Sequence, residues 1–192
     1  MSYISKRKQG VEQTAMREMD IKPLGPSPVI RATLSEMLIE AVAHGGSVSF
    51  MHPLPREVAD AFWENSLSAA ARGDRVVLGA FDGDLLVGTV TLVLDLAPNQ
   101  PHRAEIAKMI TRISHRGRGV ATALLEKAEC MAAERARTLL VLDTAADGGA
   151  SALYEAVGFK LAGVIPDYSL KPQGGLTDVR YYWKRLATAA AA

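Results

Sequence analysis

Apolar residues recur every three to four positions in four stretches of the chain, a spacing that places them on one face of a helix. Pro28 suits the start of the first helix, because its missing N–H needs no partner there, and Gly73 suits a C-terminal cap for the second. On the third helix the lone cysteine, Cys130, has apolar neighbours and is predicted to be buried. The four helices are predicted over residues 28–43, 55–72, 120–137 and 149–157.

Shorter apolar runs between the helices predict strands. Asp82-Gly83, between the second and third of these runs, is typical of a tight hairpin. The order β-α-α-β-β-β-α-β-α-β-β predicts a mixed α/β sheet whose first half is an antiparallel meander. If the last strand lies at an edge of the sheet, it could pair with a second copy, so monomer and homodimer both stay open. The strands are predicted over residues 21–24, 75–81, 85–96, 104–113, 139–142, 161–165 and 179–183.

Composition changes this picture little. With 192 residues, 48% of them hydrophobic, one domain is expected over 19–186, with a flexible arm over 1–18 and a disordered tail over 187–192. The net charge of +1 gives no electrostatic argument for a nucleic-acid or membrane partner. No apolar run suits a signal peptide or a membrane span, so a cytoplasmic protein is expected. His44 and His52 lack a clear third ligand, so no metal is expected.

The run Arg116-Gly117-Arg118-Gly119-Val120-Ala121-Thr122 joins a predicted strand to a predicted helix. Glycines there let backbone N–H groups approach a ligand, and the start of the helix carries partial positive charge. Two arginines suit a diphosphate, although both could instead lie on a solvated turn. A P-loop is excluded because no Gly-Lys-Ser/Thr follows, and a Rossmann turn is disfavoured because it would open a parallel sheet. A phosphate-bearing cofactor is therefore expected.

Two motifs within 104–159 resemble the acetyl-CoA-binding core of the GNAT superfamily of N-acetyltransferases. The residues from Arg116 to Ala121 match the superfamily signature Gln/Arg-x-x-Gly-x-Gly/Ala, and Leu153-Tyr154-Glu155-Ala156-Val157-Gly158-Phe159 matches its Leu-Tyr-Glu-x-x-Gly-Phe run. Segments inside and outside this core extend the likeness to the tabtoxin-resistance acetyltransferases, which acetylate the amine of a β-lactam amino-acid toxin. These segments are 44–51, 103–105, 142–144 and 181–182.

The resemblance implies the GNAT fold, a mixed and mostly antiparallel sheet flanked by helices. Its one parallel pair, the strands over 104–113 and 139–142, is expected to splay around the cofactor. The implied activity is that of an acyltransferase, an N-acetyltransferase that moves an acetyl group from acetyl-CoA directly to a primary amine of a small molecule. An antibiotic or a tabtoxin-like toxin would be such an acceptor. A protein amine as acceptor, and a non-catalytic acyl-CoA-binding domain, stay open as alternatives.

The resemblance also implies where the co-substrate lies. The pantetheine and thioester are expected along the backbone of Met109, Ile110 and Thr111. The diphosphate is expected on the backbone N–H groups of Gly117 to Thr122, with charge from Arg116 and Arg118. The cofactor-binding residues expected after the strand are thus Arg116, Gly117, Arg118, Gly119, Val120, Ala121 and Thr122.

Tyr154 is the candidate acid, because a phenol with a pKa near 10 can protonate a thiolate whose free pKa is about 8.5. Asp143 and Glu105 are the candidate bases, and Asp143 is preferred because it ends the strand beside the expected reaction centre. Either carboxylate could equally be a structural charge, and Tyr154 a core residue. By strand alternation Glu105 is expected to share a face with Met109 and Thr111.

The acceptor pocket is expected to form from the loop over 44–51 and the loop before the last strand. Ser47, Phe50 and Tyr168 are the candidate contacts with the acceptor, although packing or exposure would also explain each of them. His115 is predicted to be a solvent-facing loop residue. Asp147 stands where many relatives of the superfamily carry asparagine, and it is predicted to cap the following helix instead.

Overall fold

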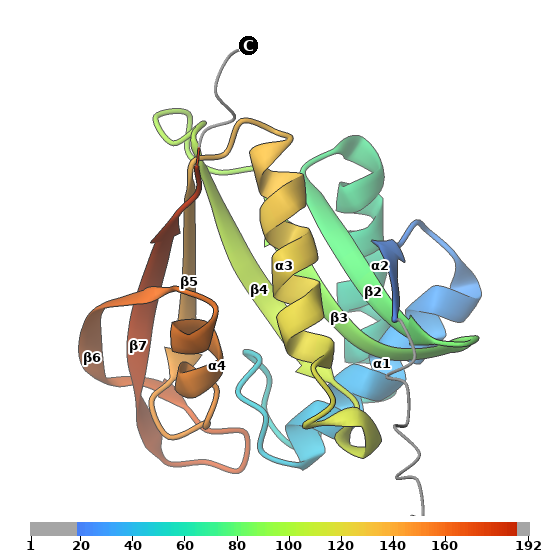
Figure 1. The fold of residues 1–192 in the computed structure, drawn as a ribbon. Helices are drawn as coiled ribbons and strands as arrows, with labels where there is room; N and C mark the ends of the chain where they lie inside the picture. The colour runs from blue at the N-terminus through green and yellow to red at the C-terminus, as the bar shows by residue number, and fades with distance from the viewer. Residues whose placement is uncertain (1–18, 188–192) are drawn as a thin grey trace, which may run out of the picture.

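A single seven-stranded sheet with helices on both faces makes up the computed structural model, which describes residues 19–187 (Figure 1). The predicted arm and all but the first residue of the predicted tail lie outside the described residues. The strands are β1 (Asp20–Pro23), β2 (Arg75–Asp82), β3 (Leu85–Val93), β4 (Arg103–Thr111), β5 (Leu139–Ala145), β6 (Lys160–Leu170) and β7 (Leu176–Arg185). The helices are α1 (Pro28–Ala43), α2 (Arg56–Arg72), α3 (Val120–Ala133) and α4 (Ser151–Ala156), with a 3₁₀ turn, η1 (Ile113–His115).

The strand order is β1-β2-β3-β4-β5-β7-β6, and every neighbouring pair is antiparallel except β4 with β5. The predicted mixed sheet, with its antiparallel first half and its parallel pair, is confirmed. The predicted element order is also confirmed. These agreements arise because each short apolar run between helices supplied one strand of the sheet.

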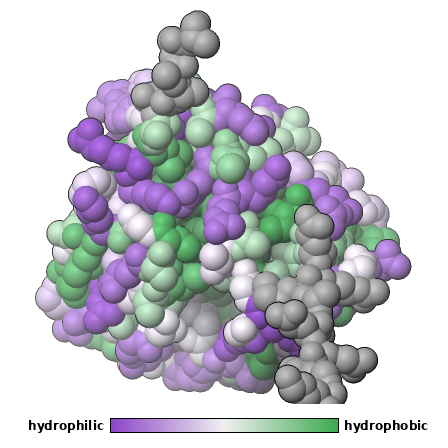
Figure 2. Space-filling view, viewed as in Figure 1, coloured by the Kyte–Doolittle hydropathy of each residue, from purple (hydrophilic) through white to green (hydrophobic). Residues whose placement is uncertain are grey.

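The last strand does not lie at the edge of the sheet. β7 pairs along its length with β5 on one side and β6 on the other, so the edge strand is β6. β6 carries exposed apolar side chains at Leu161, Val164 and Ile165, and Figure 2 shows hydrophobic residues along this margin at the left of the view. The prediction that 179–183 could pair with a second copy fails on this topology, because the backbone of β7 is already paired within the chain.

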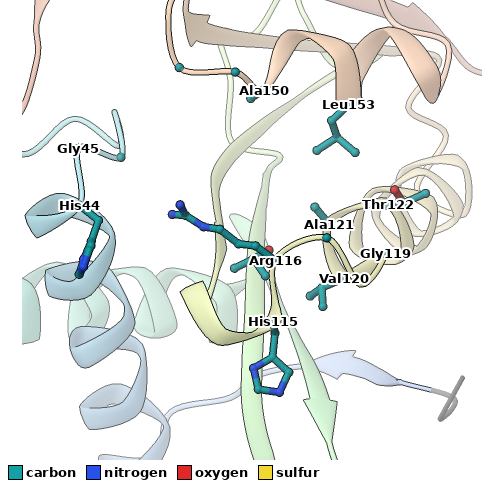
Figure 3. Close-up of a pocket in the computed structure, with 15 residues that line it drawn as sticks. His44, Gly45, His115, Arg116, Gly119, Val120, Ala121, Thr122, Ala150 and Leu153 are labelled. Carbon is teal, nitrogen blue, oxygen red and sulfur yellow. The ribbon is translucent and has the colours of Figure 1, made fainter. Parts of the chain in front are cut away.

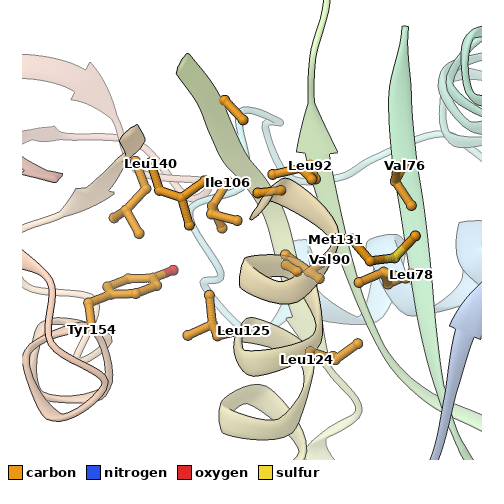
Figure 4. Close-up of a cluster of buried hydrophobic side chains, with 14 of the residues drawn as sticks. Val76, Leu78, Val90, Leu92, Ile106, Leu124, Leu125, Met131, Leu140 and Tyr154 are labelled. Atoms are coloured by element: carbon orange, nitrogen blue, oxygen red, sulfur yellow. The ribbon is translucent and has the colours of Figure 1, made fainter. Parts of the chain in front are cut away.

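Two hydrophobic cores lie on opposite faces of the sheet. On one face α3 packs Leu124, Leu125 and Met131 against β2, β3 and β4 (Figure 4), and on the other α1 and α2 enclose Trp63. Cys130 is exposed, contrary to the prediction of a buried thiol. At 100° per residue it points away from the face that buries its neighbours Ala128 and Met131.

Local sequence signals predicted some helix ends correctly and others incorrectly. α1 begins and ends as predicted, and the Ser27 hydroxyl accepts a hydrogen bond from the Ile30 N–H at 3.5 Å. α3 ends at Ala133 rather than at residue 137, because Ala136 takes the left-handed conformation (φ 55°) and turns the chain towards β5. No helix within 19–187 is long and apolar enough to cross a membrane.

The start of α3 lies directly against the sheet at Gly88 of β3. A Cβ atom on Gly88 would come within 2.5 Å of Val120 Cγ1 and 3.0 Å of Leu124 Cδ1. Val120 and Leu124 are themselves almost fully buried. A side chain on β3 would therefore push the first turn of α3 outwards, so this glycine fixes where the N-terminus of the helix lies.

Candidate active site

A gap opens in the middle of the sheet where β4 and β5 separate. The two strands pair over three residues, from Arg103 with Leu139 to Glu105 with Val141, and then diverge (Figure 1). β5 continues to pair with β7, and β4 with β3, so each strand keeps its other neighbour. The facing edges of β4 and β5 beyond Glu105 are thus available to a ligand that lies between them.

One cleft, which we call the phosphate cleft, lies at the mouth of this gap and has a volume of about 550 Å³. The start of α3, the end of α1 and the loop before α4 form its walls. Arg116 reaches across it towards His44 and Gly45 (Figure 3). Its lining includes seven of the predicted cofactor-binding residues, namely Thr111, Arg116, Gly117, Gly119, Val120, Ala121 and Thr122.

The turn into α3 presents free backbone donors to the phosphate cleft. The Arg116 N–H donates to the Ile113 carbonyl at 3.3 Å, and the next amide that donates to the backbone is that of Ala123, which bonds to the Gly119 carbonyl at 3.0 Å. Within the described chain, the N–H groups from Gly117 to Thr122 have no backbone acceptor. Gly117 and Gly119 have φ of 72° and 79°, and no atom lies within 4 Å of a Cβ placed on either. The turn therefore fits an anionic, phosphate-sized group.

A second pocket of about 300 Å³, which we call the inner pocket, continues from the phosphate cleft into the gap between β4 and β5. The two share Gly46, Arg116, Gly148 and Ala150 among their lining residues. Six predicted site residues line the inner pocket, and they come from five separate segments of the chain. They are Ser47, Glu105, Met109, Arg116, Asp143 and Tyr154.

A β-bulge in β4 changes which side chains face the inner pocket. The pairing with β3 shifts there, so that Lys108 and Met109 together oppose one residue of β3. Ile106 packs in the core beneath α3, and so does Met109, although strand alternation would place them on opposite faces. The expectation that Glu105 and Met109 share a face is therefore wrong.

Lys108 is the site residue that sequence reasoning missed. It has a φ of 50°, and its Nζ donates to Ser49 Oγ at 3.0 Å, beside the rings of Phe50 and Phe62. Strand alternation would have put Lys108 on the face opposite to Glu105, and the bulge turns it to the same pocket. No signal in the sequence marks the bulge, because its stabilising contacts come from distant elements.

Tyr154 is buried between α4 and the core, with its ring 6.0 Å from Phe159 and 6.1 Å from Tyr182. Figure 4 shows its hydroxyl pointing from α4 towards α3 and β4. Within the described chain this hydroxyl has no hydrogen-bond partner, although it lies at the inner pocket. Burial, with a smaller effect of the Asp143 carboxylate, raises the pKa of Tyr154 to about 12. The phenol is thus fully protonated at neutral pH and free to donate.

The two candidate bases differ in their surroundings. Glu105 lies 3.7 Å from the guanidinium of Arg103, which partly neutralises it. The Asp143 carboxylate has no ion pair or hydrogen bond within residues 19–187, and it is exposed at the pocket. Desolvation lowers the pKa of the Lys108 ammonium, while Asp143 and Glu105 act in the opposite direction, so all three charges lie within electrostatic reach of one another.

Four predicted site residues do not line either pocket. Ile110 is buried in the core beneath α1 and α2, and Arg118 is exposed on the turn. Phe50 packs edge-on against Phe62 at 5.2 Å, and Tyr168 packs edge-on against Tyr181 at 5.9 Å. Hydrogen bonding to Tyr168 raises the pKa of Tyr181 to about 12.

His115 is among the residues that line the phosphate cleft, and its ring lies 3.6 Å from Asp82, with a side chain that is only 12% exposed. It is therefore not the solvent-facing residue that we expected. Across the described chain, no group of three or more His, Cys, Asp or Glu residues is placed to hold a metal ion.

The turn between β6 and β7 is bonded to the end of α1 and to the loop that follows it. The His52 N–H donates to the Pro172 carbonyl at 2.8 Å, and Gln173 Nε2 donates to the carbonyls of Val42 and Ala43, each at 3.2 Å. These bonds tie the end of α1 and the loop that follows it to the far edge of the sheet. The loop that carries Ser47 is thereby held over the pocket.

Asp147 does not cap α4, in contrast to the prediction. Its carboxylate forms an ion pair with Lys171 and accepts a hydrogen bond from Thr177 Oγ1 at 3.0 Å. The bond from Lys171 lowers the pKa of Asp147, with a further contribution from Thr177. Asp147 therefore fastens the β5–α4 loop to the β6–β7 hairpin.

The family model of the acetyltransferase (GNAT) family matches residues 39–159, well over half of the chain. The chain belongs to the GNAT family. All residues that line the phosphate cleft and the inner pocket fall within the matched segment. The sequence motifs at Arg116–Ala121 and Leu153–Phe159 thus led to the correct family.

Solved structures of other proteins have the same fold. The yncA protein of Salmonella typhimurium, solved with its cofactor acetyl-CoA, is 19% identical with a TM-score of 0.73 over 90% of this chain and 96% of that one. A phosphinothricin acetyltransferase of Sinorhizobium meliloti, in complex with acetyl-CoA, is 17% identical with a TM-score of 0.76 over 91% of each chain. A ribosomal-protein-alanine N-acetyltransferase of Brucella melitensis is 22% identical with a TM-score of 0.72 over 86% of this chain and 99% of that one.

The raised pKa of Tyr154 predicts a specific loss of stability in alkali. Unfolded tyrosine ionises near its ordinary pKa of 10.0, whereas the native phenol keeps its proton up to about 12. Between these values ionisation favours the unfolded chain, so the free energy of unfolding should fall more steeply in the wild type than in Tyr154→Phe. Urea unfolding followed from pH 9 to about pH 12 would measure this. Parallel curves for the two proteins would contradict the burial of the phenol.

Proposed function

We propose that this protein is an N-acetyltransferase that moves the acetyl group of acetyl-CoA directly to the primary amine of a small molecule. The observation that carries the proposal is the continuity between the phosphate cleft and the inner pocket. The cleft ends in free backbone donors at the start of α3, and the pocket holds an acid and two carboxylates. A co-substrate and an acceptor can therefore meet in one cavity, as direct transfer requires.

The proposed positions of the co-substrate follow from the donors on the chain. The amides from Gly117 to Thr122 and the Arg116 guanidinium would hold the diphosphate. The free edge of β4 beyond Glu105, next to Met109, would pair with the pantetheine arm as an added strand does. Acetyl-CoA supplies an activated acetyl thioester. The yncA protein and the phosphinothricin acetyltransferase, which have a similar fold, were solved with acetyl-CoA, and this supports acetyl-CoA as the co-substrate.

The residues of the inner pocket would move two protons. Asp143, or Glu105 in its place, accepts one proton from the acceptor ammonium, directly or through water, so that the nitrogen lone pair can attack the thioester carbon. As the C–S bond breaks, Tyr154 donates its proton to the departing sulfur. Burial raises the pKa of the phenol, and desolvation would also raise the pKa of a CoA thiol beside it. The two pKa values therefore stay close enough for proton transfer from the phenol to the thiolate.

A small acceptor is favoured over a protein chain by the size of the inner pocket. The pocket has a volume of about 300 Å³, and the β6–β7 turn holds the loop with Ser47 over it. An amine-bearing antibiotic or tabtoxin-like toxin is the acceptor that the sequence resemblance implies, and a phosphinothricin acetyltransferase is among the proteins of similar fold.

Thiol release from acetyl-CoA tests the proposed activity. We expect release with small primary amines, and a kcat at least about tenfold lower in Tyr154→Phe, because the leaving sulfur loses its proton donor. The panel should include antibiotics, amino compounds and peptides with free N-termini. Release with peptides alone would favour a protein acceptor. Tight binding of CoA without release across the whole panel would instead identify a non-catalytic acyl-CoA-binding domain.

A pair of glycine variants tests the phosphate site. Gly119→Ala would strain a residue with φ 79° and would place a methyl group in the cleft, so the KM for acetyl-CoA should rise about tenfold or more. Gly83→Ala, in the β2–β3 turn, has a similar φ of 62° and open space around it, but it lies outside the cleft. The proposed phosphate site would be supported if both variants lost a similar amount of Tm but only Gly119→Ala changed the KM for acetyl-CoA. Equal KM values in both variants would place the co-substrate elsewhere.

The pH dependence of kcat/KM distinguishes the two candidate bases. The base must be ionised to accept a proton, so activity of the wild type should fall towards low pH. We expect Asp143→Asn to abolish this fall and to lower kcat/KM by at least about a hundredfold. Glu105→Gln should keep the pH profile of the wild type. The reverse result would assign the base to Glu105. An unchanged profile in both variants would remove these carboxylates from proton transfer.

A further inference from the structure

Two opposite charges lie in the inner pocket without pairing with each other. Within residues 19–187, Lys108 has no carboxylate at ion-pair distance, and Asp143 has no cation. The contacts of Lys108 are the hydroxyl of Ser49 at 3.0 Å and the faces of two aromatic rings, with Nζ 5.8 Å from the centre of Phe50 and 5.7 Å from that of Phe62. These contacts stabilise an ammonium but provide no carboxylate in direct contact with it, since Asp143 and Glu105 act on its charge from a greater distance.

The position of Lys108 makes this arrangement costly for the protein alone. Burial of part of the side chain lowers the pKa of the ammonium, and the backbone of Lys108 takes the left-handed conformation at the bulge. A partly desolvated cation without a counter-ion in direct contact is unfavourable, and an anion supplied by a ligand would reduce that cost. A ligand in the pocket can bring such an anion into contact with Nζ, whereas Asp143 and Glu105 act on Lys108 only from beyond ion-pair distance.

We propose that Lys108 and Ser49 form a subsite for an acidic group of the acceptor, so that the acceptor carries both an amine and a carboxylate or a related acid. This inference rests on the proposed function. Asp143 and Glu105 would attract the ammonium end of the acceptor, while Lys108 repels it and attracts the acidic end. The acceptor would therefore bind in one orientation, with its amine beside the carboxylates and next to Tyr154.

The bulge explains how one strand supplies both ends of this subsite. Glu105 and Lys108 are separated by two residues on β4 and would face opposite sides of a regular strand. With the bulge, both line the same pocket. Positive charge at Lys108 and negative charge at Glu105 and Asp143 thus complement a dipolar molecule.

Matched pairs of acceptors test the subsite. Alanine, β-alanine and 4-aminobutanoate each have a carboxamide of the same shape that lacks the negative charge. We expect the wild type to prefer the acid to its amide by about 10- to 100-fold in kcat/KM in at least one pair, the range of a hydrogen bond between charged groups. In Lys108→Met the ratio should fall to about one, and in Lys108→Arg the preference should persist.

The ratio within each protein is its own control for losses of activity or folding. Met and Lys are both unbranched, so the strain at φ 50° is unchanged by the substitution, which melting curves would verify. Lys127→Met, on the exposed side of α3, is the matched control and should keep the wild-type ratio. A wild type that uses the amides as well as the acids, or a Lys108→Met variant that keeps the preference, would overturn the proposal.

Failure of the proposed function would be recognised separately. If acetyl-CoA binds but no amine releases thiol, the acetyltransferase proposal fails, and calorimetry of the same acids and amides with the CoA-bound protein then decides the subsite. Binding that is selective for the acids and is lost in Lys108→Met would support it. Equal binding of acids and amides, or binding of neither, would refute it.

Discussion

The separation of β4 from β5 is the constraint on which the site depends. A parallel pair that continued along its full length would fill the middle of the sheet with backbone hydrogen bonds. Here the pairing stops after Glu105 and Val141, because β5 follows β7 while β4 follows β3. Each strand remains satisfied on one side, so the gap costs few hydrogen bonds within the protein. It provides backbone donors and acceptors to whatever enters between the strands.

The position of α3 completes this arrangement. Its first turn lies against Gly88 of β3, where no side chain separates helix and sheet, and its free amides therefore open onto the mouth of the gap. Leu124, Leu125 and Met131 then hold the helix on the core of the same sheet. Burial of this apolar face, more than the sequence of the turn itself, fixes the direction in which the amides point.

The polar side chains of the inner pocket come from three different elements of the fold. Asp143 comes from β5, Glu105 and Lys108 from β4, and Tyr154 from α4. The loop after α1 lines the pocket, and the β6–β7 turn is bonded to this part of the chain through Gln173 and the backbone of His52. The chemistry that we propose thus depends on contacts across both halves of the sheet, and Asp147 contributes by linking the β5–α4 loop to the hairpin.

The sequence by itself determined the elements, their order and the family, and it singled out the turn at Gly117–Thr122 whose backbone N–H groups are free. These depend on local rules, since apolar periodicity, Pro28, Gly73 and a motif of adjacent residues are all visible over a few positions. Only the tertiary structure decided that β7 is internal and that Lys108 faces Glu105. Strand order and a β-bulge are set by packing between distant segments, and a shift of one residue moves a side chain to the other face of the sheet.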